Sequence, residues 1–390
     1  MLSVLKTSLR NGAIIAAPLL FLAAPAFADP FVQTNLVSNI PGLATITDPQ
    51  LVNPWGFSHS ATSPFWISNQ GSNDSTLYAV TGATTVTKTN INPPDGFVLV
   101  PQIAGGPNGP TGQVNNTNAS SFLVGNGGNG TRASFIFADL NGSISAWNGG
   151  ATAFNQQTVQ GAVFTGLTIN TAQTQLYAAN SAGTGGIQVF NSAFAPISLG
   201  AGAFATPSAI AALGLVTFNV KDINGTVYVT YAPAGRAAQT TAAGAGVGAV
   251  AVFNESGTLI RTLINNNMAA PWGVAIAPTG FGPFSDALLV GNFSFAESEI
   301  NAYDPLTGNF LGSIAINTGG ASAGGLWEIG FGGGGSNGDP NTLYFNDGIN
   351  GERAGLFGAI QAIPEPVTIS LFSAGLIGAA ALRRRKKRAV

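Results

Sequence analysis

Two stretches decide the fold of this chain, Pro54-Trp55-Gly56-Phe57 and Pro271-Trp272-Gly273-Val274. Each is followed by an apolar run that ends in asparagine, at Asn69 and at Asn292, and then by a further apolar run. The runs are rich in Val, Ile, Phe, Tyr and Thr and are bounded by Gly, Asn, Asp and Pro, which is typical of antiparallel strands joined by tight turns. Related units begin near residues 165 and 326, and two weaker units cover 135–147 and 227–253.

The units recur at a regular spacing. The second strand of each unit is expected to end at Asn69, Asp139, Asn180, Tyr231, Asn292 and Asn346. These positions are about 55 residues apart on average, a period found in propeller arrays. We therefore predict an all-β, six-bladed β-propeller over residues 29–361. A solenoid is the alternative, but it needs polar capping ends, and the sequence shows none.

The first predicted strand has no partner strand close to it in the sequence. Residues 31–37 precede the first unit, and the last unit ends early, at 359–361. We expect the orphan strand to pair into the last blade and close the ring. Two Asn-Gly pairs, at 141–142 and 224–225, predict type I′ hairpin turns, because both residues of that turn need positive φ.

The composition excludes several classes of protein. Only 8% of residues are charged, so a largely helical protein with solvated faces is excluded. There is no cysteine, which removes disulfide scaffolds and thiolate chemistry. Of fourteen basic residues, six lie at 383–388 and only six lie between residues 11 and 382. The body is therefore anionic and has no basic stripe, so we do not expect nucleic-acid binding.

The N-terminus has the pattern of a secretory signal peptide over residues 1–28. Lys6 and Arg10 supply the positive start, an apolar helix-forming stretch follows, and Ala26 and Ala28 are the small residues at a cleavage site. We expect signal peptidase to cut after Ala28.

The C-terminal segment, 362–390, contains Pro364-Glu365-Pro366, an uncharged stretch over 367–382 and the basic cluster. Sixteen helical residues span about 24 Å, slightly short of a hydrocarbon core of about 30 Å. We predict a short transmembrane helix, and the basic end should stay on the cytoplasmic side. A simple tail anchor that is never processed is the alternative.

This order of elements resembles the PEP-CTERM sorting signal of exported bacterial proteins. The resemblance covers residues 363–388 and implies recognition by an exosortase in a Gram-negative bacterium, with transient anchoring in the inner membrane. It also implies release or attachment at the cell surface, in a setting of exopolysaccharide and biofilm. At the level of fold, the body resembles six-bladed propellers of the NHL and lactonase-like type. Over 31–361 it is similar to a group of PEP-CTERM propeller proteins with an Asn-Pro-Trp-Gly blade start.

The polar residues at the strand ends are the candidate site, because propeller ligands bind where loops converge at the channel. The candidates for a ligand ring are Asn69, Asp139, Asn180, Asn292 and Asn346. Lactonase-like propellers hold a divalent cation with such oxygens, and hard cations favour them. Only Asp139 is charged, so turn capping by the side chains is the favoured reading. We expect no cofactor, with a divalent cation as the alternative.

No catalytic residue is assigned from the sequence. His59 is the single histidine and aligns with Ile169, Ile276 and Phe331, which favours a place in the core. The recurring Trp55, Trp272 and Trp327 favour packing, with sugar stacking as the alternative. Glu297, Glu299 and Glu328 have no spacing that singles out a glycosidase pair.

The sequence therefore predicts a monomeric, exported binding or scaffold propeller associated with exopolysaccharide. A secreted metal-dependent hydrolase or lyase is the alternative.

Overall fold

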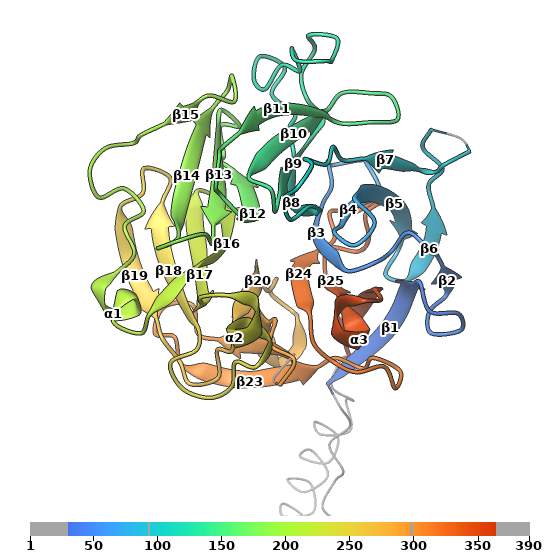
Figure 1. Ribbon diagram of the computed structural model, residues 1–390. Helices are drawn as coiled ribbons and strands as arrows, with labels where there is room; N and C mark the ends of the chain where they lie inside the picture. Colours follow the sequence, from blue (N-terminus) through green and yellow to red (C-terminus); the bar gives the residue numbers. More distant parts are fainter. Residues whose placement is uncertain (1–29, 93, 297–298, 364–390) are drawn as a thin grey trace, which may run out of the picture.

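Six mainly antiparallel sheets surround a central axis in the computed structural model, which describes residues 30–92, 94–296 and 299–363 (Figure 1). The first strands of neighbouring blades lie next to one another around the whole ring, including the last blade against the first. The predicted six-bladed β-propeller is confirmed.

Each blade is a sheet of at least four strands. Blade 1 contains β3 (Pro54–Ser58), β4 (Phe65–Asn69), β5 (Asp74–Thr81), β6 (Thr85–Lys88) and β7 (Phe97–Leu99); blade 2, β8 (Pro110–Asn115), β9 (Phe135–Asp139), β10 (Ser143–Trp147) and β11 (Phe154–Thr158). Blade 3 contains β12 (Phe164–Ile169), β13 (Gln175–Asn180), β14 (Gly186–Asn191) and β15 (Pro196–Ile197); blade 4, β16 (Leu215–Ile223), β17 (Thr226–Pro233), β18 (Ala249–Asn254) and β19 (Leu259–Leu263). Blade 5 contains β20 (Pro271–Ile276), β21 (Leu288–Asn292), β22 (Glu299–Tyr303) and β23 (Phe310–Ala315); blade 6, β24 (Leu326–Phe331), β25 (Thr342–Asp347), β26 (Leu356–Ala362), β1 (Phe31–Ser38) and β2 (Ile46–Thr47).

The ring is closed by strand β1. It pairs antiparallel with β26, from Phe31 opposite Ala362 to Ser38 opposite Leu356. Leu36 and Val37 of β1 are fully buried in the apolar layer between blades 6 and 1. The expected clasp between the first strand and the last blade is confirmed.

The first strand of every blade begins with a bulge that interrupts its pairing with the second strand. In blades 1 and 5 the bulge is the Trp-Gly pair, and in blade 2 it is Thr111-Gly112. A Cβ on Gly112 would lie 2.2 Å from the backbone nitrogen of Leu167 in blade 3. Glycine is therefore needed at this position because the inner strands approach one another backbone to backbone.

One of the two predicted hairpin turns is confirmed and the other is wrong. Asn224 and Gly225 both have positive φ, at 54° and 82°, as a type I′ turn requires. In the other turn only Gly142 has positive φ, and its N–H donates to the carbonyl of Asp139. Asn141 keeps negative φ because the turn holds one residue more between the strands, with Gly142 as the left-handed residue that follows it.

The apolar core is divided among the blades. Within the described residues, six buried apolar clusters lie between neighbouring blades and a seventh lies at the axis. Because every sheet is buried on both faces, the high apolar content is explained by the strands alone.

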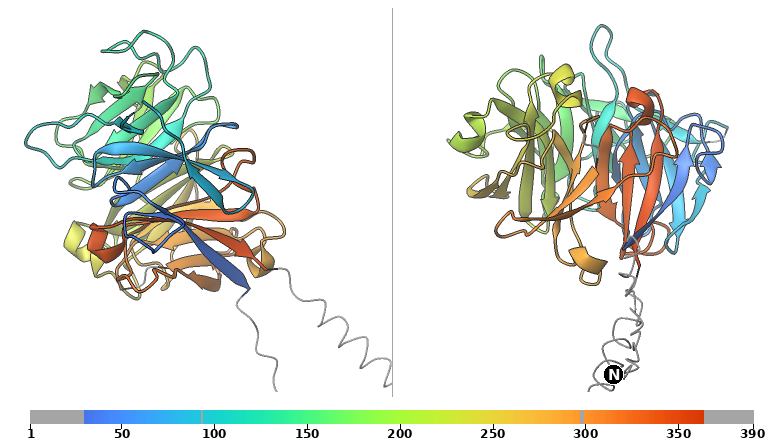
Figure 2. Two further views of the ribbon diagram at one scale, coloured as in Figure 1. Left: turned by 90° about the vertical axis from the view of Figure 1, so that its right-hand side faces the viewer. Right: turned by 90° about the horizontal axis from the view of Figure 1, so that it is seen from below.

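The described residues also include short helices in the connections between strands. They are α1 (Ser208–Ala211), α2 (Arg236–Thr240), α3 (Ile349–Glu352) and the 3-10 helix η1 (Gly282–Phe284). The two helices α2 and α3 follow second strands and lie on one face, which we call the α2 face, and η1 lies on the opposite face (Figure 2). Across the described ranges, no helix is long and apolar enough to cross a membrane. The predicted signal and transmembrane helices lie outside the described residues.

Candidate functional site

Three tryptophan rings fill the axis at the α2 face. Trp55 and Trp327 stack with ring centroids 3.5 Å apart, and Trp272 meets both rings edge-on. All three are buried, because they project inward from the bulges that open β3, β20 and β24. The Trp272 indole N–H donates to the carbonyl of Thr165, which fixes its ring across the axis. The packing interpretation of the recurring tryptophans is confirmed.

An arginine of α2 covers this cluster. The Arg236 guanidinium lies 4.0 Å from the ring centroid of Phe293 and 5.2 Å from that of Trp327. It forms an ion pair with Glu352 of α3. A cation over aromatic faces is attracted by their quadrupoles. Two loops from blades 4 and 6 are thereby tied together above the tryptophans.

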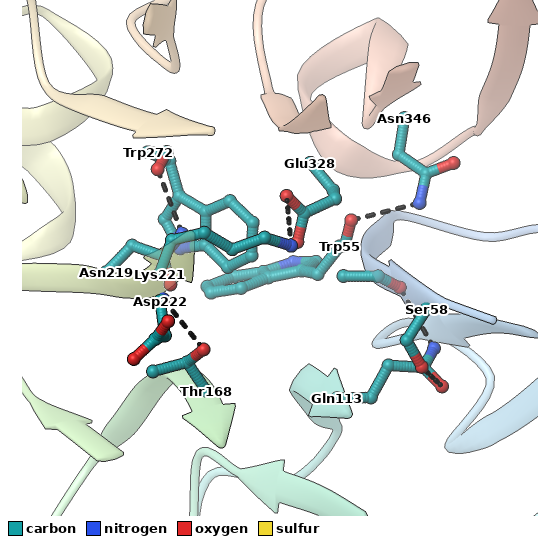
Figure 3. Close-up of polar contacts among 11 residues, drawn as sticks. Trp55, Ser58, Gln113, Thr168, Asn219, Lys221, Asp222, Trp272, Glu328 and Asn346 are labelled. Carbon is teal, nitrogen blue, oxygen red and sulfur yellow. Dashed lines mark hydrogen bonds and ion pairs between the residues drawn. The ribbon is translucent and has the colours of Figure 1, made fainter. Parts of the chain in front are cut away.

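An ion pair crosses the axis beneath the tryptophans. Lys221 of β16 and Glu328 of β24 come from non-adjacent blades, and the Lys221 Nζ lies 3.3 Å from Glu328 Oε1 (Figure 3). Glu328 is 4% exposed. Burial raises the pKa of Glu328, and the charge of Lys221 counteracts part of that rise.

Glu328 occupies a position that is glycine in most blades. Following the bulges, it corresponds to Gly56, Gly112, Gly166 and Gly273. Blade 4 has Asn219 there, whose side-chain amide donates to the carbonyl of Trp272 at 2.9 Å. Blades 4 and 6 thus place a side chain at a position where the other four blades have only backbone.

Amide side chains around the axis join neighbouring blades rather than facing an open site. Gln113 donates to the carbonyls of Gly56 and Trp66 in blade 1, at 3.1 and 2.9 Å. Asn346 of blade 6 donates to the carbonyl of Trp55, at 3.0 Å (Figure 3). Each bond satisfies a backbone carbonyl of the neighbouring blade.

Asp139, the one charged member of the predicted ring, accepts hydrogen bonds from backbone groups of its own blade. Its carboxylate accepts the N–H of Gly109 at 3.1 Å and that of Asn141 at 3.0 Å. Burial raises the pKa of Asp139 to about 6, and the two N–H donors oppose that rise. The carboxylate therefore ties the loop that enters blade 2 to the end of β9.

The asparagines of the ring play similar local roles. Asn180 accepts the N–H of Val163, and Asn292 accepts that of Ala269, each at 3.0 Å. Asn69 instead donates to Asp74 Oδ1 in the next strand, at 2.7 Å. Asn180 and Asn292 thus tie each strand end to the loop that enters the same blade, and Asn69 ties it to the next strand.

The pairing register of the strands shows that one member of the predicted ligand ring was assigned to the wrong residue. Asp347 lies opposite Leu326, just as Asn69 lies opposite Pro54, so Asp347 and not Asn346 corresponds to the other strand ends. Asp347 is fully buried, and burial raises its pKa to about 8. Among the described residues neither of its carboxylate oxygens has a hydrogen-bond partner. The spacing of the repeats alone does not show which of the two adjacent residues, Asn346 or Asp347, ends the strand.

The described residues contain no cluster of three His, Asp or Glu side chains suited to a metal ion. Binding of a divalent cation by the ring stays the alternative that a titration must test.

His59 follows β3, and its Nδ1 lies 3.1 Å from the carbonyl oxygen of Ser60. Its ring meets that of Phe65 edge-on, and burial lowers the pKa of the imidazole. His59 is half-buried and lies just after the end of β3, so it borders the core rather than lying within it as the sequence suggested. Glu299 begins β22, apart from Glu328 at the axis, and Glu297 lies outside the described residues.

A pocket that the sequence did not reveal opens between blades 1 and 2 on the face opposite α2. Its volume is about 480 Å³, and its lining includes Trp66, Arg132 and Trp147. These residues come from two blades and from loops outside the repeated pattern, so no periodicity connects them.

Comparison with known proteins gives similarities without a stated activity. No family model matches the chain. The chain is 28% identical over 293 residues to Uncharacterized protein R648 of Acanthamoeba polyphaga mimivirus, covering 73% of this chain and 69% of that protein. It is 26% identical over 309 residues to Uncharacterized protein L690 of the same virus, covering 73% and 74%.

Two solved structures are similar in arrangement. One is a structural genomics protein of unknown function from Bacteroides thetaiotaomicron, with 10% identity and a TM-score of 0.48, covering 85% of this chain and 76% of that chain. The other is a chain of a nidogen/laminin complex, with 13% identity and a TM-score of 0.42, covering 70% and 84%.

Proposed function

We propose that this chain is an exported propeller that binds an extracellular polysaccharide at the cell surface or in the surrounding matrix and has no catalytic role. The observation that carries the proposal is the filled axis. Three tryptophans and the Lys221–Glu328 pair occupy the space where a propeller would hold a reacting molecule. The pocket between blades 1 and 2 instead offers a concave surface of a size that suits a small ligand.

Export and sorting belong to the same proposal. Residues 1–28 act as a signal peptide, and an exosortase processes the chain near Pro364-Glu365-Pro366 after transient anchoring in the inner membrane of a Gram-negative bacterium. Two positions support this. The clasp begins at Phe31 and ends at Ala362, so both cuts would leave every strand pair of the ring in place. The processed protein acts as a monomer and needs no cofactor.

Two measurements test the proposal. Mass spectrometry of the protein from culture supernatant should find a chain that starts near residue 29 and ends near residue 364. Co-sedimentation with the polysaccharide of the producing cells should enrich the protein, whereas a panel of lactones, esters and polysaccharides should show no turnover. Protein confined to the cytoplasm, or turnover without polysaccharide binding, would refute the proposal.

A further inference from the structure

The pocket between blades 1 and 2 has an aromatic wall. The Trp66 ring stacks on Phe135, with centroids 4.0 Å apart, and lies 4.8 Å from the Trp147 ring. Trp66 and Phe135 are almost completely buried, while Trp147 is half-buried and forms the accessible part of the wall. The Trp147 indole N–H donates to the carbonyl of Gly150 at 2.8 Å, which holds the ring in place. An apolar, rigid ring is thus presented to the pocket.

The same pocket is lined by a cation without an acidic partner. Arg132 donates one bond, to the carbonyl of Asn116 at 2.5 Å. No carboxylate within the described residues lies within ion-pair distance of it, whereas Lys88, Lys221 and Arg236 each have one. Because the body as a whole is anionic, an unpaired guanidinium in a concave site gives the pocket a local charge opposite to its surroundings.

Hydrogen-bonding groups line the remaining side. Asn115 donates its side-chain amide to the carbonyl of Ser134 at 2.9 Å, which leaves Asn115 Oδ1 without a partner among the described residues. Ser134 also lines the pocket, and Ser60 and Ser63 contribute from the loop after β3. These groups can accept from and donate to hydroxyls of a ligand.

We propose that this pocket binds a carboxylate-bearing sugar, a hexuronate unit of an acidic polysaccharide. The apolar face of the sugar packs on Trp147, and its hydroxyls bond to Asn115 and Ser134. Its carboxylate pairs with Arg132, whose planar guanidinium matches a carboxylate in two parallel hydrogen bonds. The inference rests on the proposed binding function and deepens it by naming the class of sugar.

Isothermal titration of the full chain with trigalacturonate and with a neutral trisaccharide, maltotriose, tests the class of ligand. We expect the acidic trisaccharide to bind at least tenfold more tightly, and its affinity to fall with added salt because the contact is ionic. Arg132→Gln should remove that preference and leave neutral binding unchanged. Arg132→Lys should keep part of it, because the charge remains while the paired geometry is lost.

Two variants separate the pocket from the rest of the surface. Trp147→Ala should weaken both trisaccharides, and Arg353→Gln, which removes an exposed arginine on the α2 face, should weaken neither. Melting curves check that each variant folds.

The outcomes distinguish the two proposals. If both trisaccharides bind equally and Arg132→Gln changes neither affinity, the proposal of an acidic sugar is wrong, while the proposal of polysaccharide binding stands. Binding of a sulfated or phosphorylated trisaccharide but not of the uronate also overturns the carboxylate assignment. If both Trp147→Ala and Arg132→Gln still bind the polysaccharide of the producing cells, the pocket is not the binding site, but the proposed function stands. If the protein binds no saccharide at all, both proposals are wrong.

Discussion

Removal of the lysine from the axial ion pair should destabilise the propeller in a pH-dependent way. The Lys221 Nζ lies 3.3 Å from Glu328, and the two side chains are 28% and 5% exposed. At an effective dielectric constant of about 20, that separation corresponds to an attraction of about 5 kcal/mol. Lys221→Met leaves Glu328 buried and unpaired, and loss of one partner of a buried pair costs about 3–5 kcal/mol. We expect about 3 kcal/mol, because the lysine retains some contact with solvent.

The sign of the pH dependence follows from the raised pKa of Glu328. A carboxyl whose pKa is higher in the folded than in the unfolded chain binds more protons when folded, so stability falls as pH rises through that interval. Removing Lys221 raises the folded pKa further. The loss caused by Lys221→Met should therefore be larger at pH 8 than at pH 5.

Thermal melting followed by circular dichroism measures the effect. For a domain of this length, about 3 kcal/mol corresponds to a decrease of about 4 °C in Tm. Lys88→Met is the matched control, because Lys88 is 30% exposed and pairs with Asp48, which is 2% exposed. Asp48 keeps two other donors, the hydroxyl of Tyr78 and the N–H of Gln50. The control should lose about 1 kcal/mol.

A double variant tests whether the unpaired carboxyl of Glu328 causes the loss. Glu328→Gly in the Lys221→Met background restores the residue found in four other blades and removes the unpaired carboxyl, so most of the pH-dependent loss should disappear. Equal losses for Lys221→Met and Lys88→Met at both pH values would refute the reasoning that the axis is held by a buried charge pair.

Three further predictions concern the clasp, the cover of the tryptophans and the strand-end carboxylate. Deletion of residues 31–37 should lower the Tm sharply because the ring opens, and an unchanged melting curve would refute the clasp. Arg236→Ala should make the tryptophan fluorescence more sensitive to acrylamide and cost about 1–2 kcal/mol, with Glu352→Gln showing a smaller effect in the same assay. Asp139→Asn should change stability by less than about 1 kcal/mol at pH 7, since an amide oxygen can still accept from Gly109. The stability of the unaltered protein should decrease as the pH rises from about 4 to 6, because the pKa of Asp139 is raised in the folded chain, and Asp139→Asn should not show this decrease. A rise in Tm with millimolar Ca²⁺ that this variant lost would establish the cation site instead.

The repeats predicted the number of blades and the clasp because both depend on patterns carried by many residues. The repeat pattern does not reveal the first strands of the two weaker units, β8 and β16, because Thr111-Gly112 and Phe218-Asn219 replace the Trp-Gly pair there. The packing of Trp55 and Trp327 followed from their recurrence, but the stacking of their rings depends on a closed ring of blades.

The ion pair and the pocket could not be predicted from spacing. Glu328 takes the position of a glycine in four other blades, and its partner Lys221 belongs to a blade two positions away around the ring. Trp66 and Trp147 are about 80 residues apart and come together through the contact of two blades. Sequence periodicity places residues within a unit, whereas both of these features arise between units.

The clasp also determines how the disc responds to force. The carbonyl of Pro30 accepts the N–H of Ile363, so the two ends of the described chain leave side by side. Strand β26 is paired on both sides, with β25 and with β1. A pull on the carboxyl end alone therefore shears two ladders of hydrogen bonds at once. A pull that separates the two ends peels β1 away one bond at a time, so the same ring should withstand drag through a C-terminal tether and yield to traction between its ends.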